Sequence, residues 1–137
     1  MGFKKGTYVR GILVILMLGM LGTFSFSVQA SNVVIVANTS VQSQTLNPSQ
    51  LRSIFSMRQS TWPDGQPIKV YVFARNSDIH QTFCKEVLRM FPYQVERIWN
   101  KLTYSGLGEL PILVANEQEM SDRINSEPGA IGYLLAS

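Results

Sequence analysis

Short apolar runs recur along this 137-residue chain, with longer amphipathic stretches between them. Residues 32–37 and 68–74 are rich in β-branched and aromatic side chains, which predicts two strands. The first run is continuous, so we expect that strand to be buried on both faces. Residues 111–115 predict a third short strand. Residues 130–135, which follow the turn signal at Pro128-Gly129, predict a terminal strand.

Helical spacing fills the intervals between these strands. Asn47-Pro48 predicts an N-cap followed by a proline at the first helical position, so a helix is expected over residues 48–56. Ser77 is expected to cap a second helix, whose buried stripe would be Ile79, Phe83, Val87 and Met90. The alternation of strands with helices predicts the α/β fold class.

Two further helices complete the pattern. Pro92 is expected to begin a helix that Gly106 and Gly108 stop, with inner positions at Val95, Ile98, Trp99 and Leu102. A helix after Asn116 would turn Met120 and Ile124 inward. Residues 31–137 are enough for one ordinary domain with one core. We expect a single three-layer domain whose sheet is mixed and mostly parallel.

Residues 1–30 have the organisation of a secretory signal peptide. Lys4, Lys5 and Arg10 precede an apolar run over residues 11–21, and Val28-Gln29-Ala30 supplies a small-residue cleavage site. A membrane anchor is the alternative, but the run is shorter than the roughly 20 residues that a bilayer span needs. We therefore expect cleavage after Ala30, a periplasmic location for residues 31–137, and no stable membrane anchor.

Removal of this segment changes the charge balance. The whole chain has a formal net charge of +3, and Lys4, Lys5 and Arg10 account for all of it. The remaining domain is therefore neutral. A neutral domain argues against a nucleic-acid partner and against a broad electrostatic attraction to anionic lipid, although it leaves room for a local basic site.

Few side chains have the chemistry for catalysis. Cys84 is the single cysteine and His80, four residues before it, is the single histidine. This spacing is compatible with a nucleophilic Cys–His pair, but no third orienting group is evident, and packing on one helix face is the simpler interpretation. One histidine and one cysteine are also too few for a closed structural metal site. We expect no enzymatic activity, no metal and no cofactor.

The segment Arg75-Asn76-Ser77-Asp78 joins a predicted strand to a predicted helix. Backbone N–H groups at a helix start attract anions, so Arg75, Asn76 and Ser77 are candidate ligands of an oxyanion. In the opposite interpretation Ser77 and Asp78 only cap the helix and Arg75 is solvated. The carboxylate of Asp78 favours that view because it repels an incoming anion. The residues alone leave both interpretations open.

An ordered set of motifs resembles a known family. Its members are Leu51-Arg52-Ser53-Ile54-Phe55, Trp62-Pro63-Asp64-Gly65, the strand–helix junction over residues 75–83, Trp99, Ser105-Gly106 and Pro128-Gly129-Ala130-Ile131-Gly132-Tyr133. Together they resemble the periplasmic phosphate-binding proteins of ABC transporters, which belong to the type 2 periplasmic binding protein superfamily. The likeness covers residues 33–133. Those proteins have two lobes, and this chain looks like the second lobe alone.

The resemblance carries expectations for the site. The family's phosphate loop in this lobe is an Arg followed by Ser-Gly-Thr at a helix start, so Arg75 and Ser77 match, whereas Asp78 and Ile79 replace the glycine and the threonine. The resemblance implies binding of phosphate or a related oxyanion for ABC transport or sensing, with a transporter or a second copy as partner. The alternative is an interaction module that has lost its ligand and docks on another cell-envelope protein.

Overall fold

The computed structural model describes residues 32–42 and 45–136, which lie within a compact unit formed by residues 31–137. The predicted signal peptide and its cleavage site fall outside the described residues. Among the helices that are described, none has the length and apolar character needed to cross a bilayer.

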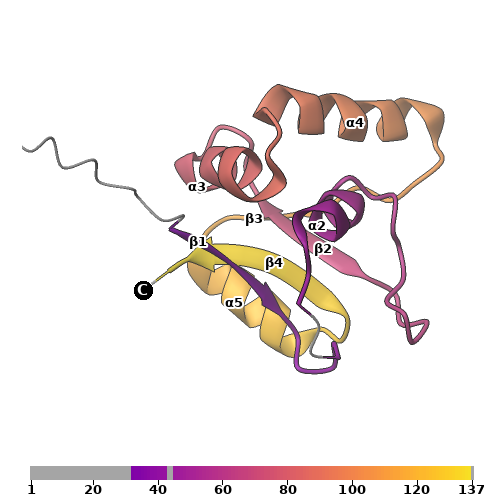
Figure 1. Cartoon of the computed structure of the whole chain (residues 1–137), viewed down its shortest axis with the longest axis vertical. Coiled ribbons are helices and arrows are strands. Elements are labelled where there is room, and N and C mark those ends of the chain that lie inside the picture. The colour runs from indigo at the N-terminus through magenta and orange to yellow at the C-terminus, as the bar shows by residue number, and fades with distance from the viewer. Residues whose placement is uncertain (1–31, 43–44, 137) are drawn as a thin grey trace, which may run out of the picture. The chain divides into compact units, whose positions relative to one another are not determined.

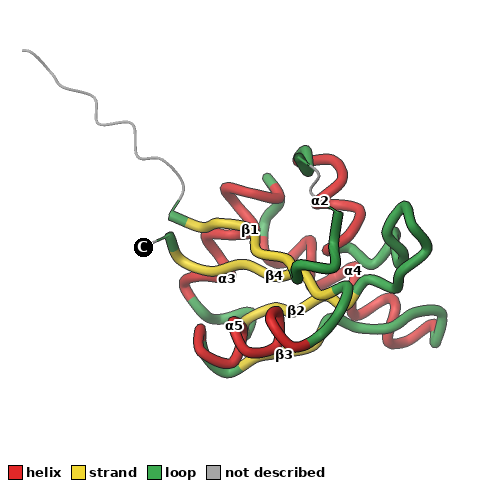
Figure 2. Tube along the Cα trace, turned by 90° about the horizontal axis from the view of Figure 1, so that it is seen from below, coloured by secondary structure: helices red, strands yellow, loops and turns green. Residues whose placement is uncertain are grey.

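Four strands form one mixed sheet in the order β1–β4–β2–β3, side by side in Figure 2. Strand β1 (Val33–Ala37) runs antiparallel to β4 (Ala130–Leu135). Strand β2 (Lys69–Phe73) runs parallel to β4 and to β3 (Ile112–Val114). The predicted α/β class with a mixed, mostly parallel sheet is confirmed.

Helices cover both faces of this sheet. Its connections contain α2 (Pro48–Phe55), α3 (Asp78–Thr82) with its π-helical continuation η1 (Phe83–Leu88), α4 (Pro92–Ser105) and α5 (Glu117–Ser126). Helix α5 lies on one side of the sheet, and α2, α3 and α4 lie on the other (Figure 1). The predicted three layers are therefore present, and every predicted strand and helix is found within two residues of its expected bounds.

The prediction that the first strand is buried on both faces is wrong. Strand β1 is an edge strand in which Val33 is buried but the Val34 side chain is 42% exposed. The two internal positions belong to β4, which pairs with β1 and β2, and to β2, which pairs with β4 and β3. A continuous run of β-branched residues does not by itself distinguish a central strand from an edge strand, because edge position depends on long-range pairing.

The predicted inner positions of two helices also need correction. Of the stripe expected from regular helical spacing, Phe83 is buried, but Ile79, Val87 and Met90 are only partly buried. The other buried residues of α3 and η1 are His80, Cys84 and Leu88. The wider i→i+5 turn of a π-helix rotates successive side chains away from that spacing. In α4 only Val95 is fully buried, while Ile98, Trp99 and Leu102 are partly exposed. Helix α4 therefore lies at the periphery of its layer.

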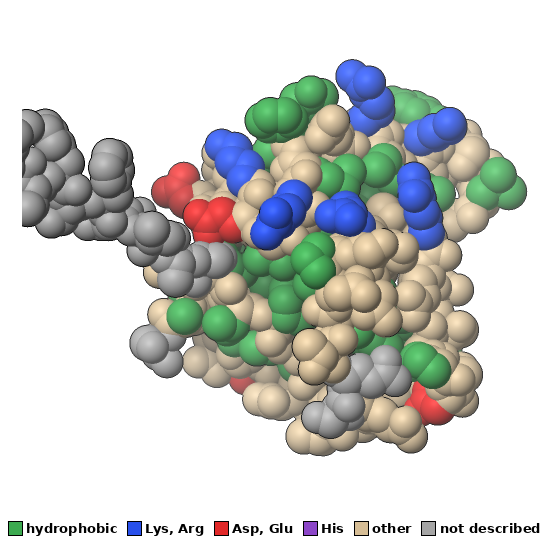
Figure 3. All heavy atoms as spheres, in the orientation of Figure 1, with side chains coloured by type: hydrophobic (Ala, Val, Ile, Leu, Met, Phe, Trp, Pro, Cys, Tyr) green, Lys and Arg blue, Asp and Glu red, His purple; other side chains and the backbone are tan. Residues whose placement is uncertain are grey.

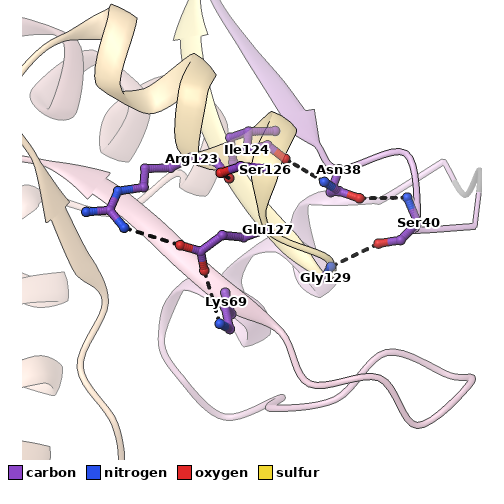
Figure 4. A network of polar contacts seen from close by, with 8 residues as sticks. All are labelled: Asn38, Ser40, Lys69, Arg123, Ile124, Ser126, Glu127 and Gly129. Atoms are coloured by element: carbon purple, nitrogen blue, oxygen red, sulfur yellow. Dashed lines mark hydrogen bonds and ion pairs between the residues drawn. The ribbon is translucent and has the colours of Figure 1, made fainter.

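The tight turn before β4 forms hydrogen bonds with residues from two other segments of the chain. The indole Nε1 of Trp62 donates to the Gly129 carbonyl oxygen at 3.0 Å, and the Gly129 N–H donates to Ser40 Oγ at 2.9 Å. Asn38 Nδ2 donates to the Ile124 carbonyl oxygen at 2.7 Å, which ties the end of β1 to α5 (Figure 4). We call this arrangement the Gly129 turn. It joins motifs that lie far apart in the sequence.

The two glycines of the C-terminal motif are required for different reasons. Gly129 has φ +79°, and a Cβ at this position would collide with the backbone carbonyl oxygen of Pro67. Gly132 faces α5, where a Cβ would lie 2.5 Å from the Met120 sulfur atom. The close neighbour that requires a glycine at this position is therefore the Met120 side chain.

We expect Gly129→Ala to destabilise the domain more than Gly65→Ala. Gly65 has a similar φ of +90° but nothing within 4 Å of the position of a Cβ. An alanine at Gly65 should cost about 1–2 kcal/mol of backbone strain, and an alanine at Gly129 a further ~1–3 kcal/mol from the contact with Pro67. Urea unfolding of both variants measures the difference. Equal losses would contradict the role assigned to this close contact.

Candidate functional site

The carboxyl ends of the parallel strands meet at one edge of the sheet. Ligands of open α/β sheets bind outside this edge, where loops lead from strands into helices. Two helices begin there: α3 follows β2, and α5 follows β3. Each helix start is a potential anion site, because its first backbone N–H groups have no partner within the helix.

The start of α5 is occupied by its own side chains. Asn116 Oδ1 accepts from the Glu119 N–H at 2.8 Å, and Glu119 Oε2 accepts from the Ala115 N–H at 2.7 Å. Glu117 Oε1 accepts from the Leu135 N–H at 3.0 Å. Two carboxylates therefore stand where an anion would bind, and they repel one.

The junction between β2 and α3 holds the three residues predicted as ligands. Arg75 and Asn76 are exposed, and Ser77 is half-buried. Ser77 is the N-cap of α3: its Oγ accepts from the His80 N–H at 3.3 Å and donates to the Ala74 carbonyl oxygen at 2.6 Å. The capping role considered from the sequence is therefore present in the structure.

Arg75 is exposed at this junction, but it has a partner. Its Nη1 forms an ion pair with Glu96 Oε1 of α4, a residue that the sequence analysis did not single out. The Arg75 side chain is 66% exposed, and exposed ion pairs contribute about 0–1 kcal/mol. An oxyanion that replaced the Glu96 carboxylate would therefore lose little from breaking this pair.

A buried chain of polar groups lies beneath the junction. The backbone N–H of Phe73, the last residue of β2, donates to the Tyr133 hydroxyl at 3.0 Å. The same hydroxyl lies 2.7 Å from His80 Nδ1, and His80 Nε2 lies 3.4 Å from Cys84 Sγ. Phe73 pairs with Val114 of β3, but the pairing of β2 with β4 ends at Val70. The Tyr133 side chain therefore supplies the partner that Phe73 lacks on the side of β4.

Burial keeps these groups neutral. It lowers the pKa of His80 to about 4 and raises the pKa of Cys84 to about 12. Burial also raises the pKa of the Tyr133 hydroxyl. The predicted contact between His80 and Cys84 on one helix face is confirmed. At neutral pH the two groups are a neutral imidazole and a thiol, and both residues are at most 1% exposed. Sequence reasoning missed Tyr133, whose only signal was its place in the terminal motif.

Comparison with known proteins identifies the fold. No protein-family model matches the sequence, and no curated protein sequence matches it. Among solved structures, the chain is similar to an ABC-type phosphate transport receptor from Vibrio cholerae, with a TM-score of 0.58 and 16% identity. The fold is consistent with one lobe of a periplasmic binding protein. The match covers 76% of this chain and 40% of the receptor, so the chain spans less than half of the receptor's length.

We expect the free energy of unfolding to fall as the pH is lowered from about 6.5 to about 4. In this window an unfolded His80 takes up a proton at its ordinary pKa of about 6.5, whereas the folded group, with a pKa of about 4, stays neutral. Above about pH 6.5, His80 is neutral in both states and the domain keeps its full stability. When the pH has fallen to about 4, the free energy of unfolding should be lower by an amount on the order of 3 kcal/mol. Urea unfolding across this window measures it.

The single histidine permits a direct control. His80 is the only histidine of the chain, so its ring resonances in an NMR titration are unambiguous. In a His80→Gln variant, the free energy of unfolding should no longer fall with pH through the titration of this residue between about pH 6.5 and about pH 4. Ring resonances that titrate near pH 6.5 in the folded protein would contradict the assignment, whether or not the variant folds.

Proposed function

We propose that this protein is a single-lobe solute-binding domain of the periplasm that binds phosphate or a related oxyanion at the β2–α3 junction. The observation that supports this site is the contrast between the two helix starts at the carboxyl edge. Carboxylates fill the start of α5, whereas the junction presents Arg75 and Asn76 at the surface. The fold shared with a phosphate transport receptor supports the class of ligand, and ABC transport or sensing is the role we propose.

Binding by this lobe alone is expected to be weak. The Glu96 carboxylate competes for Arg75, and Asp78 adds a negative charge in the first turn of α3. The lobe also offers a single surface, while a closed site would need ligands from a second one. A second copy, a transporter or another envelope protein would therefore close over Arg75, Asn76 and Ser77 in this proposal.

Substitution of either member of the Arg75–Glu96 ion pair tests the proposal, because the two substitutions should change phosphate binding in opposite directions. Arg75→Ala should abolish phosphate binding, whereas Glu96→Gln should tighten it, because the amide removes the competing carboxylate without changing the size of the side chain. The measurement is thermal unfolding of residues 31–137, freed of bound anions, in phosphate, sulfate or chloride. Phosphate at a hundred times its dissociation constant should stabilise the fold by about 2.7 kcal/mol, a shift of several degrees.

A matched control is available on the other face of the sheet. Arg123 of α5 is likewise exposed and ion-paired, with Glu119 and Glu127, so Arg123→Ala should leave the phosphate response unchanged. Equal effects of Arg75→Ala and Arg123→Ala on the response would count against the junction. A response that sulfate and chloride reproduce would count against phosphate as the ligand.

An interaction module without a ligand is the second candidate. The observation that favours it is that the lobe itself satisfies two of the proposed ligands, since Arg75 pairs with Glu96 and the Ser77 hydroxyl caps α3. This function predicts no response to phosphate and a complex with another envelope protein. A protein that stays monomeric and unpartnered in its native envelope would argue against this second candidate.

A further inference from the structure

The neutral total charge of the domain conceals a separation of charge between its two faces. Helix α5, on one side of the sheet, carries Glu117, Glu119 and Asp122 against Arg123. The opposite layer carries the excess of cations. Six of them form what we call the basic face: Arg52, Arg58, Lys85, Arg89, Arg97 and Lys101. The helices of this layer also carry three carboxylates, Asp78, Glu86 and Glu96, of which Glu96 is paired with Arg75. In Figure 3, lysine and arginine side chains gather in the upper half of the view, where this layer lies, with hydrophobic side chains among them and carboxylates at the left edge.

Helix α4 contributes the most exposed part of this surface. Tyr93, Arg97, Lys101 and Tyr104 follow one another at helical spacing on the side opposite the buried Val95, and all four are exposed. Tyr104 is 90% exposed. The one carboxylate of α4, Glu96, is paired with Arg75. The outer side of α4 is therefore both cationic and aromatic.

Two adjoining hollows lie beside α4 and have cationic walls. Met90 lines both of them. The first, of about 170 Å³, is lined by Ser49, Arg52, Ser53, Ser56, Arg58 and Ile98. The second, of about 440 Å³, is lined by Lys85, Arg89, Phe91 and Gln94. Among the described residues no carboxylate lines either hollow, and each is large enough to receive a phosphoryl group.

Part of this charge has a structural use. Arg52 lies in the last turn of α2, and Arg89 is the C-cap of η1, so these two cations offset the negative ends of the helix dipoles. Arg52 Nη1 also donates to the Leu88 carbonyl oxygen at 3.4 Å. Arg97 and Lys101 lie in the middle of α4, where no helix end requires a cation. Within the described residues neither of them has an ion pair.

We propose that the basic face docks reversibly on an anionic lipid bilayer. Its lysines and arginines would contact the phosphoryl head groups, and Tyr93 and Tyr104 would lie at the interface. Tyrosine, lysine and arginine are suited to this depth, because each has an apolar body and a polar tip. Phe91 and Leu107, exposed by 57% and 84%, flank the two ends of α4 and add apolar contact.

The geometry favours a bilayer over other anionic partners. The cations are spread over α2, η1 and α4 instead of converging on one point, which suits many head groups better than one compact anion. Helix α4 lies at the periphery of its layer (Figure 1), and a raised helix fits a flat surface. The acidic α5 lies on the opposite side of the sheet, so the separation of charge would orient the domain as it approaches an anionic surface.

Vesicle sedimentation tests this proposal. The protein is residues 31–137, a compact unit with its own core, because the apolar run over residues 11–21 would bind bilayers by itself. Vesicles of phosphatidylcholine alone are compared with vesicles that contain phosphatidylglycerol. We expect partition into the anionic vesicles only, and a steep fall with added salt. Equal partition into both kinds of vesicle, or none into the anionic ones, would overturn the proposal.

Paired variants localise the effect on the basic face. Arg97→Gln with Lys101→Gln should lower the partition coefficient by about fivefold for each charge removed. Lys69→Gln with Arg123→Gln removes the same charge from β2 and α5 and should leave partition unchanged. Equal losses in the two double variants would contradict docking through α4.

A fluorescent reporter tests the aromatic contribution. A Tyr104→Trp variant should show a blue-shifted emission when anionic vesicles are added, because the side chain leaves water. An unshifted emission would remove Tyr104 from the interface. Soluble polyglutamate serves as a competing acidic polymer without lipid. If it binds the domain as tightly as the anionic vesicles do, the basic face is a site for an acidic protein and the lipid proposal fails.

Discussion

The position of β4 depends on the constraints at the Gly129 turn. The Gly129 carbonyl oxygen accepts from Trp62, its N–H donates to Ser40, and the Pro67 backbone leaves no room for a side chain. The strand that follows pairs with β1 and β2 and carries Tyr133 beneath the end of β2. One turn thus links the N-terminal strand, the central strand and the segment on which the candidate site stands.

The candidate site and the basic face meet at one ion pair. Arg75 belongs to the junction at the carboxyl edge of the sheet, and its partner Glu96 belongs to α4, whose outer side is cationic. The neutral His80, Cys84 and Tyr133 groups fill the space beneath the junction and hold the end of β2. The proposed recognition of anions therefore rests on the exposed charges of the junction and of α4.

Local signals allowed most of the fold to be predicted. Proline restricts φ, glycine accepts a positive φ, and short polar side chains cap helices. The turn at Pro128-Gly129 and the helix starts at Asn47 and Ser77 could therefore be predicted from the sequence. The edge position of β1, the π-helical turn of η1 and the pairing of Arg75 with Glu96 were not, because each depends on contacts between distant segments. Likewise, the sequence gives a total charge but not its division between two faces of a folded domain.

The central claim is that an oxyanion binds at the β2–α3 junction. An NMR titration of residues 31–137 with inorganic phosphate tests it most directly, because backbone amide shifts report the binding position and its saturation together. The account predicts saturable shifts at the amides of residues 75–79 and at the Arg75 side chain. Shifts confined to the basic face, or no saturable shift at any amide, would contradict it.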